Sequence, residues 1–311
     1  MEKIICIAGP TASGKTELAV ALAKELGGEV VSCDSMQIYR RMDIGTAKPS
    51  RQEMEGIPHH MLDVADPEEN FSVSRYCAMA DPIVRDILSR GKWAIVAGGT
   101  GLYLDALIRG NDFAPFPRTG RREALEAQAD TEGIESVWQQ LRQADPQAAQ
   151  RLPLSDRKRI IRAMEVYLET GETITEHDRK TKLIPPRYEP CWIGLNFDPR
   201  EELYRRVDLR VHKMMEAGLL QEVRSLLDAG IPAEATSMQA IGYKELVSAC
   251  RGDESLDEAV QQIQQSSRRY AKRQLTWFRR NPGMHWILRR KDQPFGEILE
   301  EARRIVKESD K

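Results

Sequence analysis

A glycine-rich segment near the start of the chain carries residue types that bind phosphate groups. It consists of Gly9, Pro10, Thr11, Ala12, Ser13, Gly14, Lys15 and Thr16. In the Gly-x-x-x-x-Gly-Lys-Thr pattern the glycines let backbone N–H groups turn towards an anion, the lysine reaches the outer phosphate, and the threonine hydroxyl binds Mg²⁺. The segment predicts a phosphate-binding loop with Thr16 as a magnesium ligand. It leaves open which phosphate compound binds there.

A carboxylate follows the next predicted strand. Asp34, Ser35, Met36 and Gln37 come directly after residues 29–33, an apolar run of strand length. Ligands of parallel sheets bind at the carboxyl ends of the strands, so Asp34 is a candidate general base, or a group that helps to hold Mg²⁺ through water. An aspartate that only caps a turn is the alternative.

A third strand end is marked by glycines. The predicted strand at residues 93–97 is followed by Gly98, Gly99, Thr100 and Gly101. ATP-hydrolysing proteins with a phosphate-binding loop place a metal-binding aspartate at this strand end. Its absence weakens the interpretation as an ordinary ATPase.

Basic clusters suit a polyanionic partner, although the formal net charge is only −2. Four of the six residues at 157–162 are Arg or Lys, and residues 268–290 contain eight Arg or Lys and no acid. In residues 268–280 the cations are mixed with Trp277 and Phe278, which suits RNA because cations bind phosphates and rings stack on bases. A solvated charged face, with aromatic rings that only pack the helix down, is the alternative.

The elements that must position these residues alternate between strands and helices. Strands are predicted at residues 4–8, 29–33, 93–97, 191–195 and 284–288, with helices at 17–26, 71–90 and 102–108. This alternation predicts an α/β fold with a P-loop NTPase-like parallel sheet flanked by helices. Residues 112–189 contain only helical patterns, at 121–130, 134–142 and 156–169, bounded by Pro115 and Pro117 and by Pro185, Pro186 and Pro190. We therefore expect an all-helical insertion at 112–189 within a core domain of residues 1–111 and 190–311.

Composition excludes several classes of protein. With 311 residues, 41% hydrophobic and 30% charged, the chain is typical of a globular protein with a full core. No run approaches the ~18 apolar residues of a membrane span, and the N-terminus begins with a strand rather than a signal peptide. Five widely spaced cysteines indicate reduced thiols and a cytoplasmic protein. His59 and His60 lie in a predicted loop without other metal ligands at suitable spacing, so we expect structural roles for them.

The motifs together resemble those of the tRNA dimethylallyltransferases, the bacterial tRNA isopentenyltransferases. The resemblance covers nearly the whole chain in order, through residues 9–16, 34–39, 45–49, 57–60, 98–103, 240–245 and 269–279. It implies transfer of a dimethylallyl group from dimethylallyl diphosphate to the exocyclic amine of the adenosine directly 3′ of a tRNA anticodon, with Mg²⁺ as cofactor. The phosphate-binding loop would then hold a prenyl diphosphate.

The resemblance also implies roles for single residues. Asp34 corresponds to the general base, Thr100 to a residue near the reacting amine, and Lys15 and Arg210 to cations that grip the diphosphate. The positions that correspond to tRNA contacts are Asp34, Ser35, Met36, Gln37, Thr100, Arg122, Lys158, Arg159, Ile160, Ile161 and Arg162. We expect a monomer whose partner is the anticodon stem-loop of tRNA.

Three other functions remain open at this point. A small-molecule P-loop kinase would bind ATP and need no RNA. A nucleotide-gated RNA-binding protein would not need Asp34. A prenyltransferase acting on free adenylate would not need the basic insertion, which argues against it.

Overall fold

The chain divides into two compact units. A computed structural model describes residues 1–110 and 119–310; the predicted breaks at Pro115 and Pro117 lie outside these residues. One unit consists of Met1–Ile108 and Arg187–Lys311, and the other of Arg109–Pro186. We call them the core unit and the helical unit, and each is described by itself.

The core unit is built on a six-stranded sheet in which all paired strands are parallel. The strand order is β3-β2-β4-β1-β5-β6. The strands are β1 (Glu2–Ala8), β2 (Glu29–Ser32), β3 (His59–His60), β4 (Ala94–Gly98), β5 (Tyr188–Phe197) and β6 (His285–Arg289). The predicted α/β class with a parallel sheet is confirmed.

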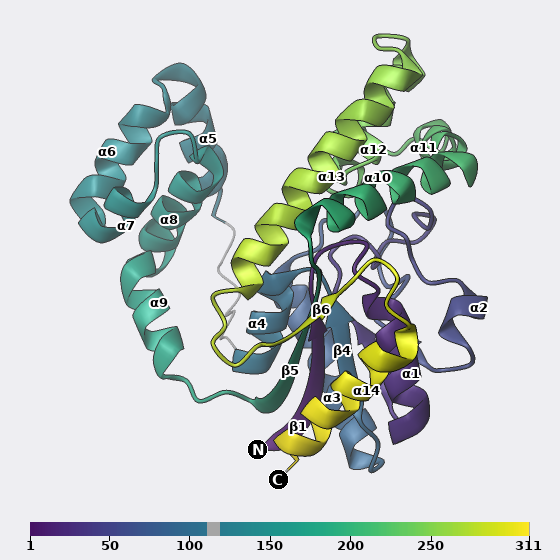
Figure 1. Cartoon of the computed structure of the whole chain (residues 1–311). Helices are drawn as coiled ribbons and strands as arrows, with labels where there is room; N and C mark the ends of the chain where they lie inside the picture. Colours follow the sequence, from purple (N-terminus) through teal and green to yellow (C-terminus); the bar gives the residue numbers. More distant parts are fainter. Residues whose placement is uncertain (111–118, 311) are drawn as a thin grey trace. The chain divides into compact units, whose positions relative to one another are not determined.

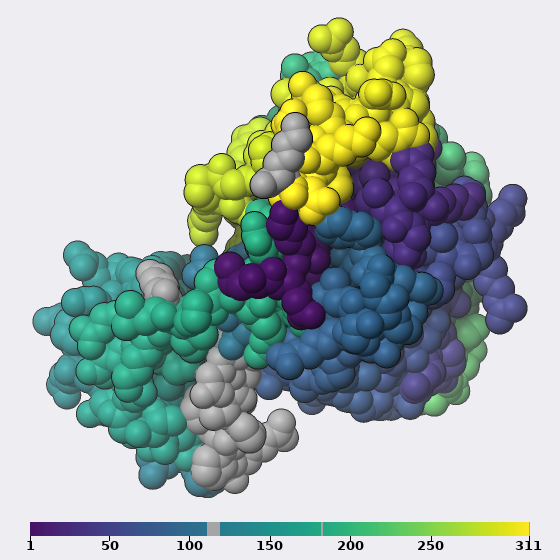
Figure 2. Space-filling view, turned by 90° about the horizontal axis from the view of Figure 1, so that it is seen from below, coloured from purple at the N-terminus to yellow at the C-terminus, as the bar shows by residue number. Residues whose placement is uncertain are grey.

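Helices cover both faces of the sheet because alternate strand residues point to opposite sides. Ile5 and Ile7 of β1 pack with α1 (Lys15–Leu26) and α14 (Phe295–Ser309). Ile4 and Cys6 pack on the other face with α3 (Val73–Ser89) and α4 (Gly101–Arg109). Figure 1 shows this layering, and Figure 2 shows α14 beside α1 on the surface.

The remaining helices of the core unit lie beyond the carboxyl ends of the strands, where a ligand of a parallel sheet binds. They are α10 (Arg200–Glu216), α11 (Leu219–Asp228), the 3₁₀ helix η1 (Ser237–Gln239), α12 (Tyr243–Arg251) and α13 (Leu256–Phe278), whereas the short helix α2 (Arg51–Met54) packs beside α1. The long helix α13 packs against both α10 and α12. Its position brings the predicted basic and aromatic segment to the region of the phosphate-binding loop.

The helical unit has a core of its own. In its described residues it contains α5 (Arg121–Thr131), α6 (Ile134–Ala144), α7 (Pro146–Arg151), α8 (Arg157–Thr170) and α9 (Ile174–Leu183). Leu125, Val137, Leu141 and Ile160 form the centre of its apolar cluster. In the described part of the chain, no helix is both long and apolar enough to cross a membrane.

Some sequence-based expectations for single elements are wrong. Residues His59–His60 form the edge strand β3, which pairs with β2, instead of the predicted loop. A strand of two residues is too short to produce an alternating pattern in the sequence, which is why it was missed. Pro190 lies inside β5 rather than in a linker, and it pairs with Ile4 of β1. Pairing of β5 with β6 starts only at Ile193, so the missing N–H of Pro190 removes no hydrogen bond to β6. The predicted helix at residues 71–90 is confirmed as α3, which continues from Val73 to Ser89 with Pro82 inside it. The sequence patterns predict no helix at the positions of α2, α7, α9 and α12.

Candidate active site

The phosphate-binding loop has a backbone that only particular residues allow. Gly9 and Gly14 have φ of 150° and 92°, and Ala12 has φ of 64°. A Cβ on Gly9 would lie 2.4 Å from the carbonyl oxygen of Leu195 in β5, so a side chain there has no space. Helix α1 begins at Lys15, so its N-terminal N–H groups and positive dipole end are directed at the loop, as anion binding requires.

Three charged side chains of this region influence one another. The Nζ atom of Lys15 donates to the carbonyl oxygen of Pro10 at 2.7 Å. Burial lowers the pKa of Lys15 to about 7, the positive charge of Arg210 lowers it as well, and the carboxylate of Asp34 opposes both effects. Burial also lowers the pKa of Arg210, again opposed by Asp34. Three predicted catalytic residues, which come from α1, α10 and the end of β2, therefore lie within electrostatic reach of one another.

Asp34 forms the turn that follows β2. Its Oδ1 atom accepts from the backbone N–H groups of Met36 at 2.9 Å and Gln37 at 3.4 Å. The turn-capping alternative is thus realised through one carboxylate oxygen. Because Asp34 also acts electrostatically on Lys15 and Arg210, it combines a local structural role with a position beside the phosphate-binding loop.

Thr100 lies against the same turn. Its Oγ1 atom accepts from the N–H of Ser35 at 3.0 Å, and the two hydroxyl oxygens are 3.4 Å apart. Burial and, second, the charge of Asp34 raise the pKa of Tyr270 in α13, while the neighbouring Thr100 lowers it. The predicted residues at the ends of β2 and β4 are therefore in direct contact.

Gln37 is held by a second loop. Its Oε1 accepts from the hydroxyl of Ser32 at 2.9 Å, and its Nε2 donates to the carbonyl oxygens of Thr46 and Ala47. The loop at residues 43–47 is in turn fixed by the carboxylate of Glu222 in α11, which accepts from three consecutive backbone N–H groups. Met36 is partly buried against the core.

Two residues that sequence reasoning missed hold the phosphate-binding loop from outside. Arg289 at the end of β6 is 8% exposed and donates to the carbonyl oxygen of Ser13 at 2.9 Å. Gln274 of α13 is 5% exposed and accepts from the N–H of Thr11 at 2.9 Å. The position of Arg289 at a strand end was a usable signal, whereas nothing in the sequence near Gln274 pointed to the loop.

Thr16 lies in the first turn of α1 and is partly buried. A hydroxyl at this position can bind Mg²⁺ together with phosphate oxygens and water. In residues 1–110 and 119–310, no group of three or more His, Cys, Asp or Glu side chains is placed to hold a metal ion. His60 instead contacts the buried carboxylate of Glu29 at 2.8 Å.

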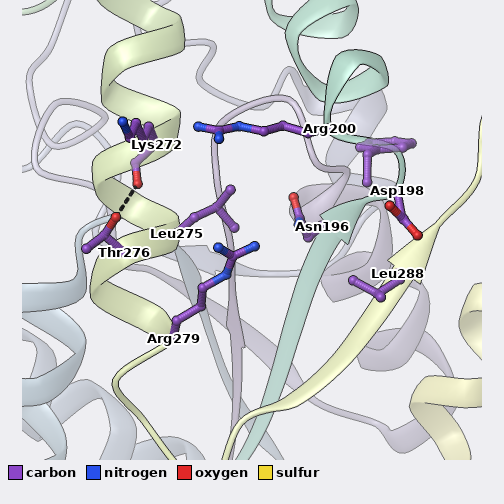
Figure 3. A pocket seen from close by; sticks show the side chains of 9 residues that line it. Asn196, Asp198, Arg200, Lys272, Leu275, Thr276, Arg279 and Leu288 are labelled. Carbon is purple, nitrogen blue, oxygen red and sulfur yellow. Dashed lines mark hydrogen bonds between the residues drawn. The ribbon is translucent and has the colours of Figure 1, made fainter.

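A pocket of about 250 Å³ lies between the end of β5, α10 and α13. Arg200, Lys272 and Arg279 line it together with Asp198, and Figure 3 shows Arg200 and Arg279 extending into the same space from their two helices. Asn196, which is 8% exposed, also lines it, and its buried Oδ1 atom has no hydrogen-bond partner among the residues that the structure describes. This pocket belongs to a basic surface of α13 that suits phosphate groups.

The predicted RNA contacts of the helical unit comprise charged side chains at the surface and apolar side chains in the core. Arg122 and Arg162, from α5 and α8, both pair with Glu165, at 3.7 and 2.9 Å. Lys158 and Arg159 are exposed on α8. Ile160 and Ile161 are 0% and 2% exposed and lie in the apolar core, so any RNA contact at these two positions does not involve their side chains.

The fold and the site define a P-loop-type α/β protein whose glycine-rich loop has the geometry for an anion, with the carboxylate of Asp34 nearby. A family model described as "IPP transferase" matches residues 37–281, and one described as "Isopentenyl transferase" matches residues 2–70. The chain belongs to the IPP transferase family.

Relatives in other organisms agree with this assignment. The chain is 46% identical over 288 residues to the tRNA dimethylallyltransferase of Acetivibrio thermocellus, covering 92% of each chain. It is 46% identical over 308 residues to that of Geobacillus thermodenitrificans, covering 98% and 96%. A tRNA isopentenylpyrophosphate transferase of Bacillus halodurans superposes with a TM-score of 0.76 at 40% identity, over 99% and 97% of the chains. A eukaryotic dimethylallyltransferase acting on tRNA gives 0.78 at 31% identity, over 89% and 70%.

Proposed function

We propose that this chain transfers a dimethylallyl group from dimethylallyl diphosphate to N6 of the adenosine directly 3′ of the tRNA anticodon. The family assignment supplies the reaction class. The observation that carries the assignment of residues is the placement of Asp34 within electrostatic reach of Lys15 and Arg210, at the strand ends next to the phosphate-binding loop. A carboxylate within electrostatic reach of two cations can take up a proton, while the cations attract an anion.

The reaction balances with the groups at the site. The N6 amine forms a bond to C1 of the dimethylallyl group, and the bond between C1 and the diphosphate oxygen breaks with both electrons leaving on the oxygen. Asp34 accepts the proton that the amine loses. Lys15, Arg210 and the N–H groups at the start of α1 offset the negative charge that grows on the diphosphate, which makes it a better leaving group.

Mg²⁺ fits this arrangement through Thr16. The cation would bind the Thr16 hydroxyl and phosphate oxygens, with water completing its shell, because magnesium takes few protein ligands when a substrate supplies phosphates. When bound, it would supply further neutralisation of the leaving diphosphate.

The RNA would be held by two basic surfaces. One is the exposed side of the basic segment at residues 268–280, together with the pocket of Arg200, Lys272 and Arg279. The other is the set of Arg122, Lys158, Arg159 and Arg162 in the helical unit. An adenine that must reach the site has to leave the base stack of the anticodon loop, and backbone contacts at several phosphates hold the RNA while this occurs.

The experiment that tests the function incubates the protein with a tRNA pool and radiolabelled dimethylallyl diphosphate, and in parallel with labelled ATP. We expect label from the prenyl donor in the RNA, and N6-isopentenyladenosine after digestion. Transfer of phosphate from ATP to a small molecule, without prenylation, would instead support the kinase alternative.

A further inference from the structure

One buried glutamine joins the two loops that form the candidate active site. The side chain of Gln274 accepts from the N–H of Thr11 in the phosphate-binding loop at 2.9 Å. Its Nε2 donates to the carbonyl oxygen of Gly99, the residue before Thr100, at 3.0 Å. The amide is 5% exposed, so water does not replace these bonds readily. A single rigid amide group thus connects the phosphate-binding loop with the loop that carries Thr100.

The surrounding face of α13 is built for this contact. Tyr270, Gln274 and Trp277 are spaced four and three residues apart and therefore share one face of the helix. A Cβ on Gly99 would lie 2.1 Å from Nε2 of Gln274, and a Cβ on Gly101 would lie 2.2 Å from Cδ1 of Trp277. The glycines after β4 therefore let α13 approach the loop closely.

Apolar packing keeps the helix in place. Ala271 and Leu275, which flank Gln274 on either side, pack with Phe197 and Leu203 in a buried cluster. Ala12 of the phosphate-binding loop packs against the same cluster. The backbone of α13 is therefore fixed relative to the loop, and the amide of Gln274 transmits that position to both Thr11 and Gly99.

We propose that Gln274 is a positioning residue that sets the separation between the diphosphate-binding loop and Thr100 during prenyl transfer. This inference rests on the proposed function. The amide can set the separation because it bonds to the backbone of both loops, whereas an apolar side chain of the same size would only fill the space. Misplacement of reacting groups by about 1 Å lowers a rate by up to about 100-fold, so the effect of losing the amide should be measurable.

The first test replaces the amide by an apolar group of similar length. In Gln274→Met both hydrogen bonds are lost, and we expect kcat to fall by about 10- to 100-fold, while the Kd for tRNA changes less than about threefold. Gln261→Met makes the same chemical change at an exposed position of the same helix and should leave all constants unchanged. The constant kcat is measured in multiple turnover at saturating tRNA and dimethylallyl diphosphate, as incorporation of labelled dimethylallyl groups. A Gln274→Met rate within twofold of wild type would overturn the proposal.

The second test asks whether protonation of the same side chain restores the lost bond, with the folded fraction of the variant measured at each pH because protonation of a buried carboxyl also changes stability. In Gln274→Glu the ionised side chain still accepts from Thr11 but cannot donate to Gly99. Burial next to a carbonyl oxygen raises the pKa of such a carboxyl, and its protonated form can make both bonds again. We therefore expect the ratio of variant to wild-type kcat to rise at least about fivefold as the pH falls from about 8 to about 6. A ratio that stays constant over this range would overturn the proposal.

The wild-type reaction separates this inference from the proposed function. If wild-type protein and Gln261→Met incorporate no prenyl label into tRNA, the proposed function fails. If both incorporate label and the Gln274 variants do so equally well at every pH, only the positioning role fails.

Discussion

Asp34 has two tasks that a substitution can separate. Its Oδ1 atom caps the turn through Met36 and Gln37, and its charge acts on Lys15 and Arg210. An asparagine can accept the same two backbone bonds but cannot take up a proton. The residue therefore offers a direct test of which task the reaction needs.

We expect Asp34→Ala to abolish transfer and Asp34→Asn to lower the rate by about 100- to 10,000-fold, the usual contribution of a general base. Both variants should bind tRNA nearly as well as the wild type, because the proposed role concerns a proton and not a phosphate. Single-turnover rates and filter-binding affinities measure the two quantities. Equal losses of rate and tRNA affinity would contradict the general-base role.

Lys15 links diphosphate binding to pH. Its pKa is lowered to about 7, chiefly by burial, so it loses its positive charge as the pH rises through 7 in the free protein. A bound diphosphate favours the charged form and raises this pKa, so binding at pH above 7 takes up a proton. Affinity should therefore weaken with rising pH, by at most about tenfold per pH unit above 7.

Calorimetric titration with inorganic pyrophosphate between about pH 6 and about pH 8.5, in two buffers that differ in ionisation enthalpy, measures both the affinity and the proton uptake. The variant Lys15→Met corrects for the titration of the ligand itself. If the variant and the wild type show the same pH dependence, the lysine does not carry the effect.

Among the secondary structure elements, α8 carries the densest group of predicted RNA contacts in the helical unit. Its apolar residues Ile160 and Ile161 fix the helix in the core, which leaves Lys158, Arg159 and Arg162 on the exposed side. Arg162 is paired with Glu165, but an exposed pair of this kind contributes only about 0–1 kcal/mol, so a phosphate can compete for the guanidinium.

We expect Lys158→Ala combined with Arg162→Ala to weaken tRNA binding and to reduce the slope of log K against log salt by about 1 to 2, because each lost phosphate contact removes somewhat less than one unit. Arg151→Ala combined with Lys180→Ala removes the same charge elsewhere in the unit and serves as the control. Gel-shift titrations at several salt concentrations give the slopes. An unchanged slope in the first variant would remove α8 from the RNA interface.

At the scale of the whole molecule, the helical unit is inserted at one point of the core unit. The backbone N–H of Arg187, where the chain returns, donates to the carbonyl oxygen of Ile108, where it leaves, at 2.7 Å. Arg187 and Tyr188 both contact Asp81 of α3, at 2.8 and 2.6 Å. The two ends of the insertion are therefore held together by the core unit itself.

A chain in which a short Gly/Ser linker replaces residues 110–186 should fold and bind pyrophosphate, because all residues of the phosphate-binding site remain. It should bind tRNA at least about tenfold more weakly, since the proposed contacts of the helical unit with phosphates are lost. Thermal unfolding, calorimetry and gel shifts test these three expectations. Wild-type tRNA affinity in the shortened chain would show that the core unit alone holds the RNA.

The sequence by itself determined those features that depend on neighbours along the chain. The phosphate-binding loop, the strand before it and the helix after it follow from residues 2–26, because turn, strand and helix patterns are local. The parallel sheet follows from the alternation of strands and helices, and Asp34 and Thr100 follow from the rule that ligands bind at strand ends. The resemblance of the motifs supplied the family.

Only the tertiary structure decided which distant side chains hold these loops in place. Gln274 reaches Thr11 across 263 positions and Arg289 reaches Ser13 across 276, and the neighbours of these residues along the chain do not identify their partners. Strand β3 also depends on tertiary structure, because its two residues form a strand only by pairing with β2. The glycines after β4 are explained only by the close approach of α13. Contacts of this range depend on packing of the complete chain, and therefore appear only when it is folded.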